Sequence, residues 1–334
     1  MKHIKIFVKL LLVAAVLFSM LHFNIIEIPN LDILFDRLTI LILLIFFTAI
    51  FVHNFGWWLL LKAQKYNITY LKSLLIYTAG TFFNIIMPGG IGGDAARCMY
   101  LYMFVKSNEK TSALFTVIIS RIIGFHALLS LCLFIGFFYY EKIISSDSLS
   151  IIYLIILTIF LLSILLLIFY IIFHKKILFF FLNLKNNKEN LFTKSIFLLI
   201  ESLNSYRKKI NYIFFSWLIS LFSHTIFLST FYFMSIQLNI NFLGFFENTV
   251  VGGLSYISNS IPITPGGIGI GESTYNYFYK LFLSGPEFAN IAFGSIFFLS
   301  YRVLYSFICI LCGLSFILIG KPKDKFTNKG YNNI

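Results

Sequence analysis

Charged residues are scarce in this sequence: they make up only 12% of its 334 residues, and Asp and Glu together number 13 against 26 Lys and Arg. Hydrophobic residues account for 59% of the chain. No water-soluble globular domain is this apolar, so the composition excludes a soluble protein and predicts an integral membrane protein. The net charge of +13 would favour a nucleic-acid partner, but the basic residues lie between apolar runs, where they orient membrane spans. We therefore expect no nucleic-acid partner.

The sequence also lacks the residue sets that mark most cofactor and metal sites. It contains no Walker A pattern, so direct use of ATP is unsupported. Its four cysteines lie in apolar segments, and the Cys309-x-x-Cys312 pair is expected to be inert in a helix core. His53, His126 and His224 lie in apolar runs without Cys or carboxylate residues at ligand spacing, so we expect hydrogen-bonded packing. We predict no metal site, no cofactor and no catalytic constellation.

The apolar runs predict an all-α polytopic membrane protein with six full spans. The first run is expected to be an uncleaved anchor, because no small-x-small cleavage site closes it before Asn24. Polar loops are expected at residues 24–38 and 141–150. An even number of spans places both termini on one side of the membrane. The six predicted spans are residues 4–23, 39–61, 111–140, 151–173, 211–236 and 288–319.

Two further apolar segments are too short to cross a bilayer, since a helical span needs about 20 residues. Residues 73–87 stop at Pro88, and residues 94–105 can return as a second short helix. Residues 242–261 stop at prolines and are followed by a similar returning segment, residues 272–283. Each unit predicts a re-entrant helical hairpin. They enter from opposite faces, so the chain is expected to contain an inverted-topology repeat, as in many alternating-access carriers.

The distribution of basic residues predicts the orientation of the spans. Of the 26 Lys and Arg residues, 20 lie on the side that carries both termini, which we assign to the cytoplasm, and three lie on the other side. The remaining three, Arg97, Arg121 and Arg302, lie within the membrane segments. The basic connector at about 174–210 is expected to lie along the membrane surface, either as a plain amphipathic linker or as a docking site for anionic lipid or a partner. A homo-oligomer or an envelope-biosynthesis partner is compatible with this arrangement.

The sequence P-G-G-I-G occurs twice, beginning at Pro88 and at Pro265. It divides the single predicted domain, residues 1–320, into repeat halves at about 39–140 and 211–319, followed by a cytoplasmic tail at 321–334. Glycines ahead of a half-helix free its first N–H groups to point at an anion such as phosphate. The same glycines could instead only allow tight packing of the hairpin tips. The glycines in question are Gly89, Gly90, Gly266 and Gly267.

Polar residues accompany each copy of the motif at matching positions. Each copy has an upstream asparagine, a carboxylate at its end, and an arginine 27 or 30 residues later in an apolar run. An arginine at mid-depth costs a few kcal/mol, so it needs a partner. The carboxylates are the available counter-ions; they form either two structural ion pairs or a site where lipid phosphate competes for the arginines. Arg97 lies three residues after Asp94, on the same helical face, and one interpretation is that it only neutralises Asp94. The candidate binding residues are Asn84, Asp94, Arg97 and Arg121 in the first half, and Asn259, Glu272 and Arg302 in the second.

These doubled motifs, with S-R-I-I-G around Arg121 and Y-R at Arg302, resemble the flippase-like family, the transmembrane domain of lysylphosphatidylglycerol synthase/flippase. The resemblance covers roughly residues 5–320. In two-domain members the family implies movement of a charged lipid from the inner to the outer leaflet. This sequence shows no aminoacyl-transferase domain after Lys321, so lysyl transfer is not expected.

Two function classes follow from the sequence. The first is translocation of a charged, phosphate-bearing lipid between leaflets of a bacterial inner membrane, with an anionic or zwitterionic lipid as the partner. The second is a membrane enzyme or accessory protein that acts on a phospholipid or polyprenyl-linked envelope intermediate, with Asp94 or Glu272 as an acid or base. No nucleophile or metal set accompanies these carboxylates, so we favour translocation.

Overall fold

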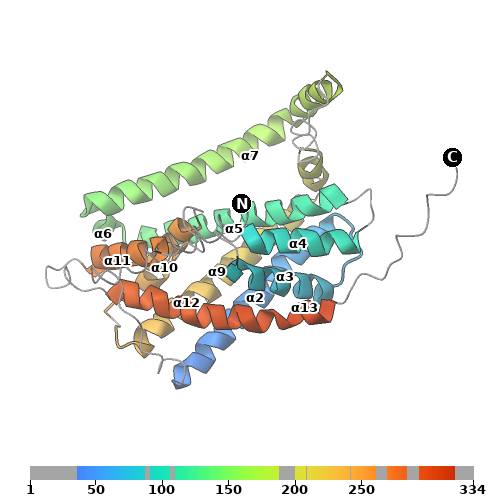
Figure 1. Ribbon diagram of the computed structural model, residues 1–334. Coiled ribbons are helices and arrows are strands. Elements are labelled where there is room, and N and C mark those ends of the chain that lie inside the picture. Colours follow the sequence, from blue (N-terminus) through green and yellow to red (C-terminus); the bar gives the residue numbers. More distant parts are fainter. Residues whose placement is uncertain are drawn as a thin grey trace, which may run out of the picture.

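The computed structural model describes residues 36–86, 91–105, 110–187, 200–207, 209–240, 242–260, 269–283 and 293–319. In these ranges all regular secondary structure is helical, which confirms the predicted all-α class (Figure 1). The helices are α2 (Arg37–Ala63), α3 (Tyr70–Ile86), α4 (Ile91–Phe104), α5 (Lys110–Phe138), α6 (Tyr140–Ile144), α7 (Asp147–Asn187), α9 (Ile210–Gln237), α10 (Phe245–Asn259), α11 (Ile270–Leu283), α12 (Phe293–Cys312) and α13 (Leu314–Ile319).

Four of these helices, α2, α5, α7 and α9, are long and apolar enough to cross a membrane. They correspond to four of the six predicted spans. The predicted first span, residues 4–23, lies outside the described residues. The predicted last span forms a shorter apolar helix, α12, followed by α13. Between them, the Gly313 amide donates to the carbonyl oxygens of Cys309 and Ile310.

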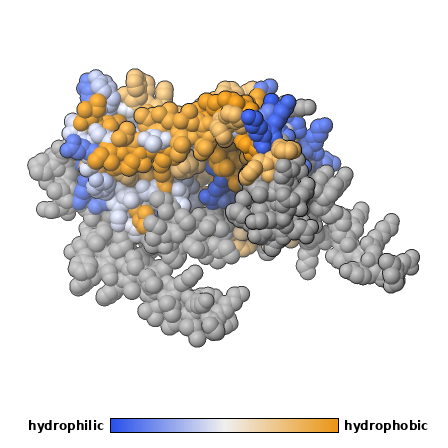
Figure 2. Space-filling view, turned by 90° about the horizontal axis from the view of Figure 1, so that it is seen from above, coloured by the Kyte–Doolittle hydropathy of each residue, from blue (hydrophilic) through white to orange (hydrophobic). Residues whose placement is uncertain are grey.

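The surface supports a membrane environment for these helices. Figure 2 shows a continuous hydrophobic band with hydrophilic residues gathered at both ends. Leu165 and Leu166 of α7 are among the many large apolar side chains that are exposed in the structure. Exposed apolar area of this extent is unfavourable in water but matches a lipid surround.

An aromatic cluster packs between α2, α9, α11 and α12 in the core of the bundle. Phe231 of α9 packs against Tyr301 with ring centroids 5.0 Å apart and against Phe297 at 5.6 Å. Tyr275 of α11 stacks on Phe297 at 4.6 Å, and Phe46 of α2 contacts Tyr301 at 5.9 Å. Such pairs each add about 0.5–1.5 kcal/mol beyond the area that they bury. This cluster fixes the helices that carry the second half of the polar residues.

The helices of the two short segments pack as antiparallel pairs, α3 with α4 and α10 with α11. In the first pair the backbones touch: a Cβ on Gly80 would lie 2.8 Å from the carbonyl oxygen of Gly93, and a Cβ on Gly93 would lie 2.6 Å from that of Gly80. Only glycine permits this approach. The two pairs lie at opposite ends of the bundle, α3 and α4 at the right and α10 and α11 at the left of Figure 1.

Some predicted boundaries were wrong. The polar loop expected at residues 141–150 is largely helical: residues 140–144 form α6, and α7 begins at Asp147. Helix α7 also continues past the predicted span end at Phe173 to Asn187, because Lys, Leu and Phe in this stretch are compatible with a helix. In the connector, residues 200–207 are helical and residues 191–199 lie outside the described ranges.

Candidate functional site

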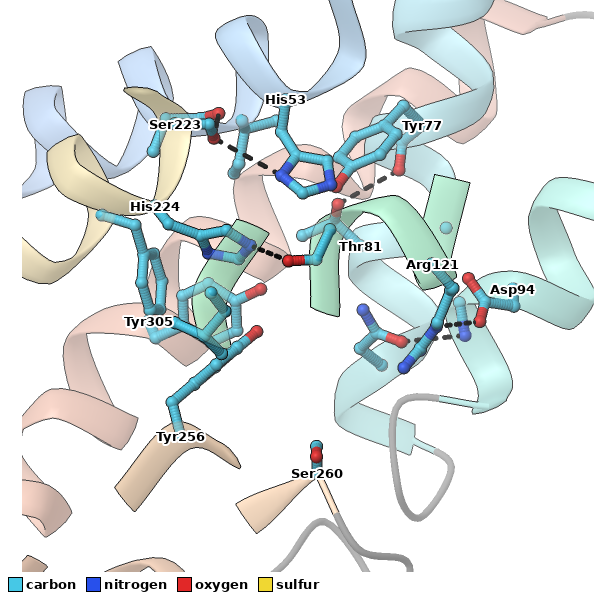
Figure 3. Close-up of a pocket in the computed structure, with 18 of the residues that line it drawn as sticks. His53, Tyr77, Thr81, Asp94, Arg121, Ser223, His224, Tyr256, Ser260 and Tyr305 are labelled. Atoms are coloured by element: carbon cyan, nitrogen blue, oxygen red, sulfur yellow. Dashed lines mark hydrogen bonds and ion pairs between the residues drawn. The ribbon is translucent and has the colours of Figure 1, made fainter. Parts of the chain in front are cut away.

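A cavity of about 690 Å³ lies between the two helix pairs, with walls from α2, α3, α4, α5, α9, α10 and α12 (Figure 3). This volume falls in the range of sites that hold small molecules or headgroups. The structure brings together residues of both sequence halves here. Six of the predicted site residues line the cavity: Asn84, Asp94, Arg97, Arg121, Asn259 and Arg302.

The other predicted site residues divide into two groups. Glu272 is fully buried, with 0% of its surface exposed, and lies behind Arg302 rather than on the cavity wall. The four predicted glycines, Gly89, Gly90, Gly266 and Gly267, lie outside the described residues. The suggested cradle of glycine N–H groups therefore stays a prediction.

In the first half, Asp94 near the start of α4 is the centre of the polar cluster. Its Oδ2 accepts a hydrogen bond from Arg121 Nε of α5, and its Oδ1 accepts from Arg97 Nη1 at 3.4 Å. Asn84 of α3 bonds the first turn of α4, because its Oδ1 accepts from the backbone amide of Gly93 at 2.9 Å. Arg121 keeps 45% of its side-chain surface exposed, so it can reach a ligand while it remains paired.

In the second half, Arg302 of α12 reaches both helices of the α10–α11 pair. Its Nε donates to Glu272 Oε1, and its Nη2 donates to Asn259 Oδ1 at 2.9 Å. The other carboxylate oxygen of Glu272 accepts from the Gly269 amide at 2.8 Å, which caps the start of α11. Gly269 has a φ of +86°, a backbone conformation that glycine adopts without strain. Arg302 retains 19% side-chain exposure.

The two halves use the same residue types differently. Asn84 binds the backbone at the start of α4, whereas Asn259 binds the guanidinium of Arg302 directly. Correspondingly, Asp94 lies on the cavity wall, but Glu272 is enclosed. The second ion pair is therefore the more enclosed of the two, and the first is the more accessible from the cavity.

Arg97 does more than neutralise Asp94. It is 7% exposed, and its guanidinium carbon lies 4.2 Å from the ring centroid of Trp57 and 4.7 Å from that of Tyr77. Its Nη2 also donates to Ser120 Oγ at 3.2 Å. Cation–π contacts and hydrogen bonds hold this charge in place without full neutralisation. Arg97 thus adds a fixed positive charge to one wall of the cavity.

Sequence reasoning did not place two histidines in the site. His53 of α2 and His224 of α9 both line the cavity, together with Ser223 and several tyrosines. The two imidazole rings meet edge to face, with centroids 5.5 Å apart. One signal could have identified them: each lies in the long helix that immediately precedes one of the helix pairs. His126 of α5, by contrast, stacks on Phe160 outside the cavity.

The charges of this cluster favour an anion. Its three guanidinium groups face two carboxylates, one of which is buried behind the wall. Guanidinium groups bind phosphate through paired hydrogen bonds. No group of three or more metal-ligating side chains occurs in the part of the chain that the structure describes. The lining also includes apolar side chains such as Phe125, Leu128 and Phe227, which suit a ligand with an organic part.

Residues 6–319 of the chain match the family described as the lysylphosphatidylglycerol synthase TM region. The match covers nearly all of the sequence, including both copies of the repeated motif and every residue of the cavity wall. No curated protein and no solved structure matches the chain.

Proposed function

The chain belongs to the lysylphosphatidylglycerol synthase TM region family, and we propose that it moves a charged, phosphate-bearing lipid between the two leaflets of a membrane by alternating access. The observation that carries this proposal is the cavity at which Arg121 and Arg302 converge from opposite halves of the chain. Each arginine is held by an acid of the neighbouring helix pair and keeps part of its surface exposed. A purely structural ion pair does not need a cavity beside it.

The proposed topology has six spans and two re-entrant hairpins in an inverted repeat. It is supported by the placement of the α3–α4 and α10–α11 pairs at opposite ends of the bundle (Figure 1). The proposed cytoplasmic side carries 20 Lys and Arg residues and the opposite side carries three. This asymmetry supports an orientation with both termini in the cytoplasm. The membrane in question is the inner membrane of a bacterium. Inverted repeats of this kind place substrate sites near the bilayer midplane.

In this mechanism the phosphate of the headgroup enters the cavity and binds Arg121. The exposed face of its guanidinium meets the phosphate oxygens, while Asp94 keeps hold of Nε. Arg302 offers the second contact on the other side of the cavity, anchored by Glu272 and Asn259. Arg97 keeps the site positive throughout. The acyl chains stay in the lipid beside the apolar surface, so only the headgroup crosses the protein.

Alternating access requires the two helix pairs to open in turn. With the α3–α4 pair open, the headgroup reaches the cavity from the cytoplasmic leaflet; with the α10–α11 pair open, it leaves to the other leaflet. After the lipid has left, the empty protein must return to its first conformation. Carboxylates that pair with the arginines lower the free-energy cost of this return, because no unpaired charge is left at mid-depth. Asp94 and Glu272 take this role.

The substrate class is tested with wild-type protein in vesicles of phosphatidylethanolamine. Each preparation contains a trace of one lipid labelled on its acyl chain, either phosphatidylglycerol or a glucosyl diacylglycerol that has the same chains and no phosphate. Leaflet-specific quenching should report rapid exchange of phosphatidylglycerol and little of the sugar lipid. Equal exchange rates for the two labelled lipids would overturn the proposal that the cavity recognises phosphate. Chemical conversion of the phospholipid, detected by mass spectrometry, favours the alternative of a membrane enzyme.

A further inference from the structure

The two cavity histidines each have one ring nitrogen committed to a hydrogen bond and the other available. His224 Nε2 lies 3.1 Å from the carbonyl oxygen of Gly124. Because a carbonyl oxygen only accepts, Nε2 carries the hydrogen and Nδ1 is the nitrogen that a second proton would take.

The same reasoning applies to His53. Ser223 Oγ donates its hydrogen to the carbonyl oxygen of Ala49 at 2.9 Å, so it accepts from His53 Nδ1, which lies 3.4 Å away. A second proton would then bind His53 at Nε2. Each imidazole therefore has one ring nitrogen left to take a second proton, and the two rings touch edge to face. A proton on either one opposes a proton on the other.

Positive groups surround this pair. The His53 ring lies 5.7 Å from the ring of Tyr77, whose face also binds the Arg97 guanidinium at 4.7 Å. The charges on the cavity wall oppose a further proton, and an anion in the cavity offsets that opposition. The titratable and charged groups that line the cavity are His53 from α2, Tyr77 from α3, Asp94 and Arg97 from α4, Arg121 from α5, His224 from α9, Tyr256 from α10, and Tyr301, Arg302 and Tyr305 from α12.

Among these groups the histidines are the best suited to exchange a proton. Asp94 and Glu272 are each committed to an ion pair with an arginine. Tyrosine and arginine ordinarily change charge far above neutral pH. Among these side chains, only the imidazole of histidine ordinarily gains or loses a proton near neutral pH. The histidines are also placed once per sequence half, in the helix before each helix pair.

We propose that His53 and His224 form a proton-binding site that couples movement of the anionic headgroup to co-transport of a proton. By linkage, an anion that favours protonation of this pair is itself bound more tightly when the pair is protonated. Headgroup and proton then cross together, and the pH gradient drives the lipid toward the alkaline side. This inference rests on the proposed translocation and adds the energy source. The proton binds an imidazole on one side of the membrane and is released on the other. No covalent bond of the lipid changes, so the step needs no further reactant.

The first test measures the final distribution of lipid rather than its rate. Vesicles with a pH difference of about one unit and a trace of fluorescent phosphatidylglycerol should reach up to about a tenfold excess of label in the leaflet that faces the alkaline side, if one proton accompanies each lipid. The His53→Gln/His224→Gln double variant should reach an even distribution. His126→Gln is the matched control, because it removes a membrane histidine outside the cavity, and should retain the excess.

An even distribution in wild-type vesicles that do exchange lipid overturns the coupling and leaves the proposed translocation intact. So does an excess retained by the double variant. If wild-type protein exchanges no lipid, translocation itself fails.

A second measurement does not depend on transport or on the rate of the variant. Detergent-solubilised protein is titrated with short-chain dihexanoyl phosphatidylglycerol by calorimetry in buffers that differ in ionisation enthalpy. Wild-type and His126→Gln proteins should take up protons on binding, and the double variant should bind without proton uptake. Lipid binding by the wild type without proton uptake overturns the proposal, as does the absence of any binding. Inorganic phosphate as a separate titrant shows whether free phosphate, rather than the lipid headgroup, is the anion recognised.

Discussion

Arg302 Nη2 donates to Oδ1 of Asn259 at 2.9 Å, although the two residues lie 43 positions apart in the chain. The same guanidinium donates through Nε to Glu272. Helix α12 is thereby tied to both members of the α10–α11 pair through one side chain. A movement of this pair relative to α12 must break these bonds or move Arg302 with it. In the proposed mechanism, Arg302 therefore links headgroup binding to the position of the pair.

Replacement of Asn259 by alanine should therefore weaken both the protein and its site. A hydrogen bond to a charged group contributes about 1.5–3 kcal/mol, so we expect a loss of that order in the free energy of unfolding in detergent, with slower lipid exchange. Asn84→Ala is the matched control, since Asn84 bonds a neutral backbone amide, and should cost only about 0.5–1.5 kcal/mol. Equal losses for the two variants would show that the bond to Arg302 has no special weight.

The Glu272–Arg302 pair should show strong coupling in stability. Glu272→Gln and Arg302→Gln each leave a charge in a buried setting without its counter-ion, which typically costs about 3–5 kcal/mol. The double variant leaves neither charge and should recover most of the loss. Unfolding of all four proteins under the same detergent conditions measures the coupling. Additive losses in the double variant would contradict direct pairing.

The close contact of α3 and α4 predicts that Gly93 tolerates no side chain. A Cβ at this position would lie 2.6 Å from the Gly80 carbonyl and 2.3 Å from Asn84 Oδ1. Gly93→Ala should lower stability by about 1–3 kcal/mol, because backbone atoms must separate. Gly244→Ala is a suitable control, since its Cβ would meet Glu247 only at 3.7 Å. A neutral effect at Gly93 would mean that the helices separate easily at this point.

The orientation of the chain is tested by single cysteine probes in a variant whose four native cysteines are replaced by alanine. A probe at Asn187, at the end of α7, should react with an impermeant thiol reagent only from the cytoplasmic side. A probe at Ser146, between α6 and α7, should react only from the opposite side. The reverse pattern would invert the assignment that rests on basic residues.

Much of the architecture follows from hydrophobic run lengths and proline positions. Helix α3 was predicted at residues 73–87 and spans Tyr70–Ile86, because Pro88 and the following glycines end a helix in any context. The pairing of Arg121 with Asp94 and of Arg302 with Glu272 followed from the cost of unpaired charge at membrane depth. These are local or strongly constrained features.

Features that depend on tertiary packing could not be predicted. Asn84 bonds a backbone amide and Asn259 bonds a guanidinium, and which partner each asparagine meets is set only once the helices have packed. The placement of Arg97 between Trp57 and Tyr77 requires three helices to converge. The helical residues of the expected loop at 141–150 were missed because polar residues such as Glu141 and Lys142, although favourable in a helix, carry no periodic apolar signal.

The central claim is that the intramembrane arginines bind the lipid headgroup in addition to pairing with Asp94 and Glu272. It is tested most directly by exchange of labelled phosphatidylglycerol in vesicles that contain the Arg302→Gln/Glu272→Gln double variant. The matched control is Lys142→Gln/Glu247→Gln, which removes an ion pair of 3.0 Å outside the cavity. We predict that the control exchanges lipid at close to the wild-type rate and that the cavity double variant, although folded, falls to the rate of protein-free vesicles. Wild-type exchange by the cavity double variant would contradict the account and leave Arg302 and Glu272 as a structural pair only.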